Sequence, residues 1–240
     1  ADQLAAKVGT SRTSVIRTAK ALGYDGYQHL RVALTQEIAQ RPQPLPDADS
    51  THVGRMSAEI ASFSNYLRGL TALLDEQELA STVAALSSAK RVLVVGNGLS
   101  APLAQTTALR LSSIGRPAEF VGEAMGQHIA ATQLDSECVC LVISGSGATT
   151  LTLNAATAAE KTGATIIALT SFTSSPLAEL SAYTLVIPSP DGTFRAELAD
   201  ASRVAFLLIL EALVTLVDSH LENVEARRTV LSVLQSAMEG

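Results

Sequence analysis

Between residues 91 and 187, short apolar runs alternate with longer segments in which apolar residues recur every three or four positions. The runs are continuous rather than alternating, which is typical of parallel strands covered by helices on both faces. This pattern predicts five parallel strands in an α/β fold, at residues 91–95, 118–121, 138–143, 165–170 and 183–187. Helices are expected to start near Ser100, Glu123 and Thr149, with a short one near Pro176.

The first 40 residues carry a different pattern, which predicts a small all-α domain. A helix containing Leu4 and Ala5 is followed by a second helix that Ser11 can cap, and a third begins near Tyr27. Three prolines then predict a linker over residues 41–55, so that the body spans residues 56–240.

The body starts with helical patterns from about Met56 and ends with two helices, at about 195–219 and 223–238. The first of these C-terminal helices is strongly apolar, and its side chains fit either a core or an interface. They are Phe206, Leu207, Leu210, Leu213, Leu216 and Val217.

Charge separates the two ends of the chain. The net charge is −6, yet residues 1–41 hold six basic and three acidic side chains. A basic end on an acidic body favours a polyanionic partner for that end alone. The longest apolar stretch is too short for a bilayer, and no signal peptide is apparent, so we expect a cytoplasmic protein without a membrane partner. Cys138 and Cys140 are expected to be buried rather than paired or metal-bound, and no cofactor or metal is expected.

Three predicted strands end in loops of glycine and small hydroxyl residues, at 96–100, 144–149 and 170–175. Because carboxyl ends of parallel strands share one sheet edge, these loops should lie together. Glycines allow close approach, helix N-termini attract anions, and hydroxyls donate hydrogen bonds. The loops therefore predict a phosphate-binding site in which dipoles and hydroxyls, and no lysine side chain, contact the phosphate.

Two enzymatic alternatives remain open at this point. Gly96, Gly98 and Ala101 fit a loose dinucleotide fingerprint, with Glu119 or Glu123 as the ribose acid. An isomerase would need a proton-transferring base, for which the candidates are Glu123, His128 and Glu197. Since no acid and base pair is visible, a binding protein without catalytic residues is favoured.

The segments VLVVGNGLSAPLAQTTALRLSSIG, VISGSGATT and ALTSFTSSPLAELSAYTLVIP resemble the sugar isomerase (SIS) domain. The resemblance implies a flavodoxin-like three-layer fold, a phosphosugar ligand, and a homodimer or homotetramer. It assigns hydroxyl contacts with the sugar phosphate to Ser100, Ser144, Ser146 and Thr149. With the loop residues and one acidic residue, the expected ligand-binding set is Gly96, Asn97, Gly98, Ser100, Ser144, Ser146, Gly147, Thr149 and Glu197. Ala148 departs from the family, which often has an acidic residue there.

The stretch LAAKVGTSRTSVIRTAKALGYDGYQHLRVAL has the layout of a helix-turn-helix and resembles the N-terminal domain of the RpiR family of bacterial transcriptional regulators. Those proteins join such a domain to a SIS domain and usually have more helix before it, so part of the N-terminal domain is expected to be missing here. The resemblance implies a regulator of transcription in carbohydrate metabolism, with operator DNA and a phosphorylated sugar effector as partners. The outward residues of the second helix are the expected DNA contacts: Ser11, Arg12, Thr13, Ser14, Arg17 and Lys20.

Overall fold

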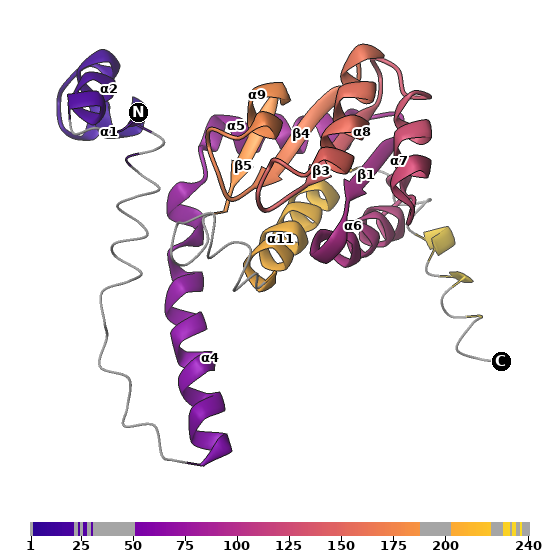
Figure 1. Cartoon of the computed structure of the whole chain (residues 1–240), viewed down its shortest axis with the longest axis horizontal. Helices are drawn as coiled ribbons and strands as arrows, with labels where there is room; N and C mark the ends of the chain where they lie inside the picture. Colours follow the sequence, from indigo (N-terminus) through magenta and orange to yellow (C-terminus); the bar gives the residue numbers. More distant parts are fainter. Residues whose placement is uncertain are drawn as a thin grey trace. The chain divides into compact units, whose positions relative to one another are not determined.

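The structure is a computed structural model that describes residues 2–21, 24, 26–27, 30, 51–187, 203–221, 228–230, 232–233 and 236 (Figure 1). Contacts divide the chain into two compact units. The first unit consists of residues 1–74 and 188–199, and the second of residues 75–187 and 200–240.

The first unit contains helices α1 (Asp2–Lys7) and α2 (Arg12–Ala21), which contact each other. Their shared core includes Ala5, Val15 and Ala19, all buried. The Ser11 hydroxyl accepts a hydrogen bond from the Ser14 N–H at 3.1 Å, so the predicted cap of the second helix is confirmed. Most of the third predicted helix lies outside the described residues.

Helix α4 (His52–Arg68) and the short 3-10 helix η1 (Leu70–Leu73) follow in the same unit. The helix starts at His52 rather than near Met56, so the last residues of the predicted linker are helical. Thr51 explains the earlier start, because its hydroxyl accepts a hydrogen bond from the Gly54 N–H at 3.0 Å and thereby caps the helix. Residues 41–50 of the predicted linker lie outside the described residues.

The second unit is built on a five-stranded parallel sheet in the order β2-β1-β3-β4-β5. The strands are β1 (Val92–Gly96), β2 (Ala118–Phe120), β3 (Val139–Ile143), β4 (Thr165–Thr170) and β5 (Tyr183–Val186). The prediction of a flavodoxin-like parallel α/β fold is confirmed. Gly96 pairs in register with Ile143, so β1 and β3 end side by side at the carboxyl edge.

Helices cover both faces of this sheet (Figure 1). Helix α11 (Val204–His220) contacts α5 (Glu76–Ser88) and α6 (Ala101–Ser113) on one side. On the other side, α8 (Thr150–Lys161) contacts α7 (Ala124–Ala131) and α9 (Pro176–Leu180). Every residue of the central strands β1 and β3 is buried, which is why these strands are continuously apolar in the sequence.

Small side chains form the core beneath α8. Ala155, Ala156 and Ala159 are fully buried and belong to one apolar cluster with Cys138 and Cys140. Both cysteines are free and buried, as predicted, and burial raises the pKa of the Cys140 thiol to about 12. The Cys140 thiol therefore acts as an apolar packing group at physiological pH, whereas the Cys138 thiol donates a hydrogen bond to Asp135 Oδ1 at 3.1 Å.

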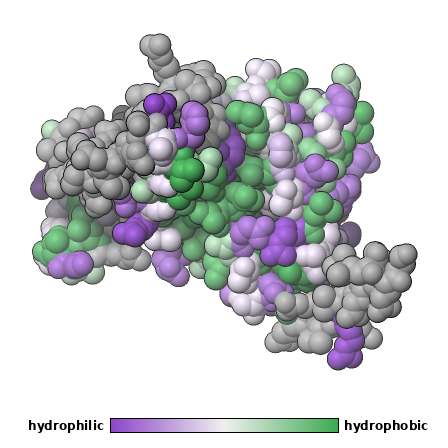
Figure 2. Space-filling model, turned by 90° about the horizontal axis from the view of Figure 1, so that it is seen from below, coloured by the Kyte–Doolittle hydropathy of each residue, from purple (hydrophilic) through white to green (hydrophobic). Residues whose placement is uncertain are grey.

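The apolar C-terminal helix contributes to both core and surface. In α11, Phe206, Leu210, Leu213 and Val217 are buried, whereas four large side chains of this helix remain exposed. These are Val204, Leu207, Leu208 and Leu216. Figure 2 shows apolar residues gathered in green on the face seen from below. The predicted start of this helix and most of the following one lie outside the described residues. Among the described helices, none is long and apolar enough to span a membrane.

Candidate functional site

The loop after β1 forms one side of the candidate site at the carboxyl edge of the sheet. Gly96 ends the strand, Asn97 follows, and Gly98–Ser100 form the 3-10 turn η2 that leads into α6. Ser100 is 4% exposed and occupies the N-cap position of α6, but its hydroxyl makes no capping hydrogen bond. The predicted residues of this loop are therefore brought together at a helix N-terminus, with the Ser100 hydroxyl left for another partner.

The loop after β3 forms the other side and is held by its own hydrogen bonds. The Gly147 N–H donates to both the carbonyl oxygen and the hydroxyl of Ser144, at 3.0 and 3.2 Å. The Ser146 hydroxyl accepts from the Ala148 N–H at 3.3 Å and lies 3.4 Å from the Thr149 hydroxyl. Ser144 is buried, Ser146 is half-buried and Thr149 is exposed, so only the last two hydroxyls face outward from the loop.

The helices that start from these two loops lack side-chain caps. Ser100 and Thr149 are the N-cap residues of α6 and α8, and neither hydroxyl accepts a backbone hydrogen bond there. By contrast, Glu123 caps α7 and Ser175 caps α9 at the same sheet edge. Both helix N-termini carry a partial positive charge, which stabilises a bound anion. The N–H groups of Ser100 and Ala101 at the start of α6 already donate to the carbonyl oxygens of Asn97 and Gly98, so on that side the Ser100 hydroxyl is the donor left for a ligand.

The third loop, at residues 170–175, supports the second loop through hydrogen bonds. The Thr170 hydroxyl and the Ser171 N–H both donate to the Gly145 carbonyl oxygen, at 3.1 and 2.9 Å. The Ser175 hydroxyl accepts from the Ala178 N–H at 3.2 Å and donates to the Phe172 carbonyl. The hydroxyls of Thr170 and Ser175, two of those expected at the phosphate site, are therefore used within the protein.

A buried amide network that the sequence did not reveal joins the first loop to two helices. Gln127 of α7 is fully buried, and its Nε2 donates to the carbonyl oxygens of Gly96 and Val121 at 3.1 and 2.9 Å. Asn97 Nδ2 donates to Gln127 Oε1 at 3.1 Å and to the Thr152 hydroxyl of α8 at 3.0 Å. Both amide hydrogens of Asn97 thus bond to protein atoms, which leaves only its Oδ1 for a ligand. A glutamine within a short helix gives no sequence signal for this role.

Two of the candidate groups for enzyme chemistry, Glu123 and Glu119, have other roles in the structure. Glu123 accepts hydrogen bonds from the N–H groups of Met125 and Gly126, which lower its pKa and make it a weaker base. His128 is exposed on α7. Glu119 forms an ion pair with Arg91, the residue that precedes β1 at the opposite end of the strand. Glu197 lies outside the described residues.

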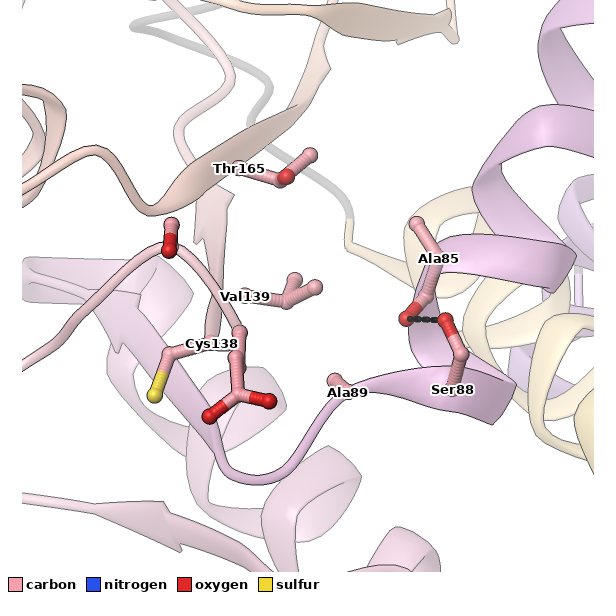
Figure 3. Close-up of a pocket in the computed structure, with 8 residues that line it drawn as sticks. Ala85, Ser88, Ala89, Cys138, Val139 and Thr165 are labelled. Atoms are coloured by element: carbon pink, nitrogen blue, oxygen red, sulfur yellow. Dashed lines mark hydrogen bonds between the residues drawn. The ribbon is translucent and has the colours of Figure 1, made fainter.

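A separate hollow of 220 Å³ lies at the amino ends of the strands, away from these loops. Figure 3 shows Val139 and Thr165 of β3 and β4 facing Ala85 and Ser88 at the end of α5, while the Cys138 thiol points away. The hydroxyl of Ser88 already donates to the Ala84 carbonyl within its own helix. This hollow lacks the convergent donors found at the carboxyl edge, so the candidate ligand site remains the pair of loops.

The predicted DNA contacts lie on α2, apart from its buried face. Ser11, Arg12, Thr13, Arg17 and Lys20 are exposed, and Ser14 is half-buried beside Ser11, with their hydroxyls 3.0 Å apart. Exposed arginine and lysine side chains on one helix are suited to phosphate contacts.

Comparison with known proteins identifies both parts of the chain. The model of the SIS domain family matches residues 85–219, and that of the helix-turn-helix domain, rpiR family, matches residues 1–41. An uncharacterized HTH-type transcriptional regulator of Caldanaerobacter subterraneus subsp. tengcongensis is 31% identical over 220 residues. The match covers 90% of this chain and 77% of that relative.

The solved structures that are similar in fold include the following two. The Vibrio vulnificus NanR protein, complexed with ManNAc-6P, is 28% identical with a TM-score of 0.68, and the match covers 99% of this chain and 86% of NanR. A putative sugar-phosphate isomerase from Listeria monocytogenes is 22% identical with a TM-score of 0.59, covering 72% and 93% of the two chains. The second likeness concerns the fold alone.

Proposed function

Because this chain belongs to the rpiR family of helix-turn-helix transcriptional regulators with a SIS domain, we propose that it senses a phosphorylated sugar or sugar-derived metabolite. The ligand binds between the loops at 96–100 and 144–149, and its binding changes how the N-terminal domain holds operator DNA. The observation that carries this proposal is the pair of uncapped helix N-termini, α6 and α8, beside the hydroxyls of Ser100, Ser146 and Thr149.

The chemistry of these loops favours a phosphate group over other ligand groups. Backbone N–H groups and small hydroxyls donate hydrogen bonds to phosphate oxygens, and the helix dipoles offset the negative charge. Neither loop contains a lysine or arginine, so charge neutralisation falls to the dipoles. NanR, whose structure contains ManNAc-6P, makes an N-acetylated hexosamine phosphate the first compound to test.

A thermal-shift screen tests this function. We expect one sugar phosphate to raise the melting temperature, by roughly 5–10 °C at a concentration of about 100 times its Kd, because it binds only the native state. The panel contains ManNAc-6P, hexose and pentose phosphates, the matching free sugars, and NAD. A response to NAD alone, or equal responses to a sugar phosphate and its free sugar, would overturn the proposal.

The N-terminal domain is the proposed DNA-binding part, with α2 as the recognition helix. We expect Arg17→Ala to weaken operator binding and to reduce the slope of log affinity against log salt by about 0.9, as one phosphate contact is lost. Fluorescence anisotropy on operator DNA over a range of salt concentrations measures both quantities. Lys161→Ala removes an equal charge from the last turn of α8 and serves as the control. An unchanged slope in Arg17→Ala would exclude a phosphate contact there.

Regulation requires two DNA-reading helices at a defined spacing, so we propose that the protein acts as a homodimer or homotetramer. The exposed apolar side chains of α11, and Leu109 on the neighbouring α6, support this proposal, because such residues commonly mark subunit interfaces. Half-sites about one helical turn apart, roughly 34–36 Å, must match the spacing of the two α2 helices. The ligand acts by binding one arrangement of the protomers better than the other.

A further inference from the structure

We infer that Gln127 is a positioning residue. Acting through Asn97, it holds the N-termini of α6 and α8 at a fixed separation, so that one ligand group can contact both. This inference rests on the proposed ligand site and adds a residue that no ligand atom needs to touch. It concerns the network of Gln127, Asn97 and Thr152 at the carboxyl edge of the sheet.

The side chain of Gln127 makes its hydrogen bonds to residues outside its own helix. Its Nε2 bonds to Gly96 O at the end of β1 and to Val121 O after β2, so it fixes the ends of two strands. Its Oε1 is then directed at Asn97. Because the side chain is 0% exposed, water cannot replace any of these partners if one is lost.

Asn97 connects Gln127 to the starts of both α6 and α8. The Asn97 carbonyl accepts the Ser100 N–H at 3.1 Å, which closes the turn η2 and directs Ser100 to the start of α6. The Asn97 amide nitrogen also bonds to Thr152, in the first turn of α8 and three residues after Thr149. Asn97 thus bonds to the start of α6 through its backbone and to the start of α8 through its side chain, which is also bonded to Gln127.

The distance between the two helix starts matters because a single phosphate must reach donors from both. A preorganised pair of donors avoids the cost of ordering two loops when the ligand binds. Loosening the network would leave each loop intact but let their separation vary, and affinity would fall without the loss of a ligand contact.

Two near-isosteric variants test the inference. Gln127→Met removes all hydrogen bonds of the amide, and Thr152→Val removes only the link to α8. Gln133→Met, at an exposed glutamine just beyond α7, is the matched control. We expect hydrogen exchange of the hydrogen-bonded backbone amides of Ser100, Ala101 and Leu153, which close the first turns of the two helix starts, to speed up in both variants without ligand. In the control these exchange rates should stay unchanged.

Binding is measured by calorimetry well below the melting temperature, with ManNAc-6P and inorganic phosphate as probes. We expect the Kd for ManNAc-6P to rise roughly tenfold or more in both variants, equivalent to one or two lost hydrogen bonds. If Gln127→Met fails to fold, Thr152→Val carries the test. Wild-type exchange rates in both variants, or unchanged affinity despite faster exchange, would overturn the inference. If no probe binds the wild-type protein, the proposed ligand fails, and the exchange rates alone decide whether Gln127 holds the loops.

Discussion

Replacing Ser100 and Ser146 together by alanine is expected to lower the affinity for the sugar phosphate by about 100-fold or more, while the protein still folds. A hydrogen bond to a charged group contributes roughly 1.5–3 kcal/mol, and two such bonds would be lost. Neither hydroxyl is important for the fold: that of Ser100 makes no capping bond, and that of Ser146 has only two long hydrogen bonds within its own loop, at 3.3 and 3.4 Å. Titration calorimetry with the sugar phosphate, beside urea unfolding, measures both effects.

The matched control for this double variant is Ser113→Ala. Ser113 ends α6, the helix that starts beside Ser100, and its hydroxyl donates to the Arg110 carbonyl oxygen at 2.7 Å. A change there leaves the ligand loops intact, so affinity should match that of the wild-type protein. If the double variant also bound the sugar phosphate with wild-type affinity, these two hydroxyls would have no place in the site.

Gly147→Ala is expected to destabilise the second unit by about 3 kcal/mol or more, since it combines backbone strain with steric overlap. Gly147 has φ +61°, a conformation that costs roughly 1–2 kcal/mol for residues with a Cβ. An added Cβ would lie 2.2 Å from Ser175 Oγ and 2.9 Å from Thr170 Oγ1. Both side chains are buried and hydrogen-bonded, so they cannot move aside freely.

Gly98 offers an internal comparison for this variant. Its φ is +58°, yet no atom lies within 4 Å of the position that a Cβ would occupy. Gly98→Ala should therefore cost only the backbone term, about 1–2 kcal/mol. Urea unfolding of the two variants, followed by circular dichroism, separates strain from overlap. Equal losses of unfolding free energy in the two variants would show that the contacts with Ser175 and Thr170 do not constrain Gly147.

The sheet was predictable because strands that are buried on both faces are continuously apolar in the sequence. Residues 165–170 coincide with β4, the run at 91–95 is shifted by one residue relative to β1, and the run at 138–143 begins one residue before β3. The helix starts expected near Ser100, Glu123, Thr149 and Pro176 agree with α6, α7, α8 and α9 to within one residue, but the start of α4 was expected four residues too late. Thr51 moved the start of α4 to His52, and η2 inserted an extra turn before α6.

The candidate site was predictable in its location but not in the division of roles among its residues. Glycine and hydroxyl residues at strand ends identify the loops, yet a hydroxyl in the sequence does not reveal its partner. Thr170 and Ser175 are hydroxyl residues at the end of a strand, as Ser146 is, but their hydroxyls bond to protein atoms. Gln127 was missed because the partners that give it a role, Gly96 and Asn97, lie 30 or more positions away in the chain.

The absence of basic side chains from the loops at 96–100 and 144–149 has a consequence for how the protein works in changing ionic conditions. Fixed dipoles exchange no counterions when an anion binds, whereas the arginine and lysine side chains that we propose for the DNA contacts would displace the ions that surround DNA. Rising salt should therefore release the chain from DNA long before it empties the ligand site. Occupancy of the ligand site would then depend on the metabolite concentration alone. Occupancy of the operator would depend on both the metabolite concentration and the salt concentration.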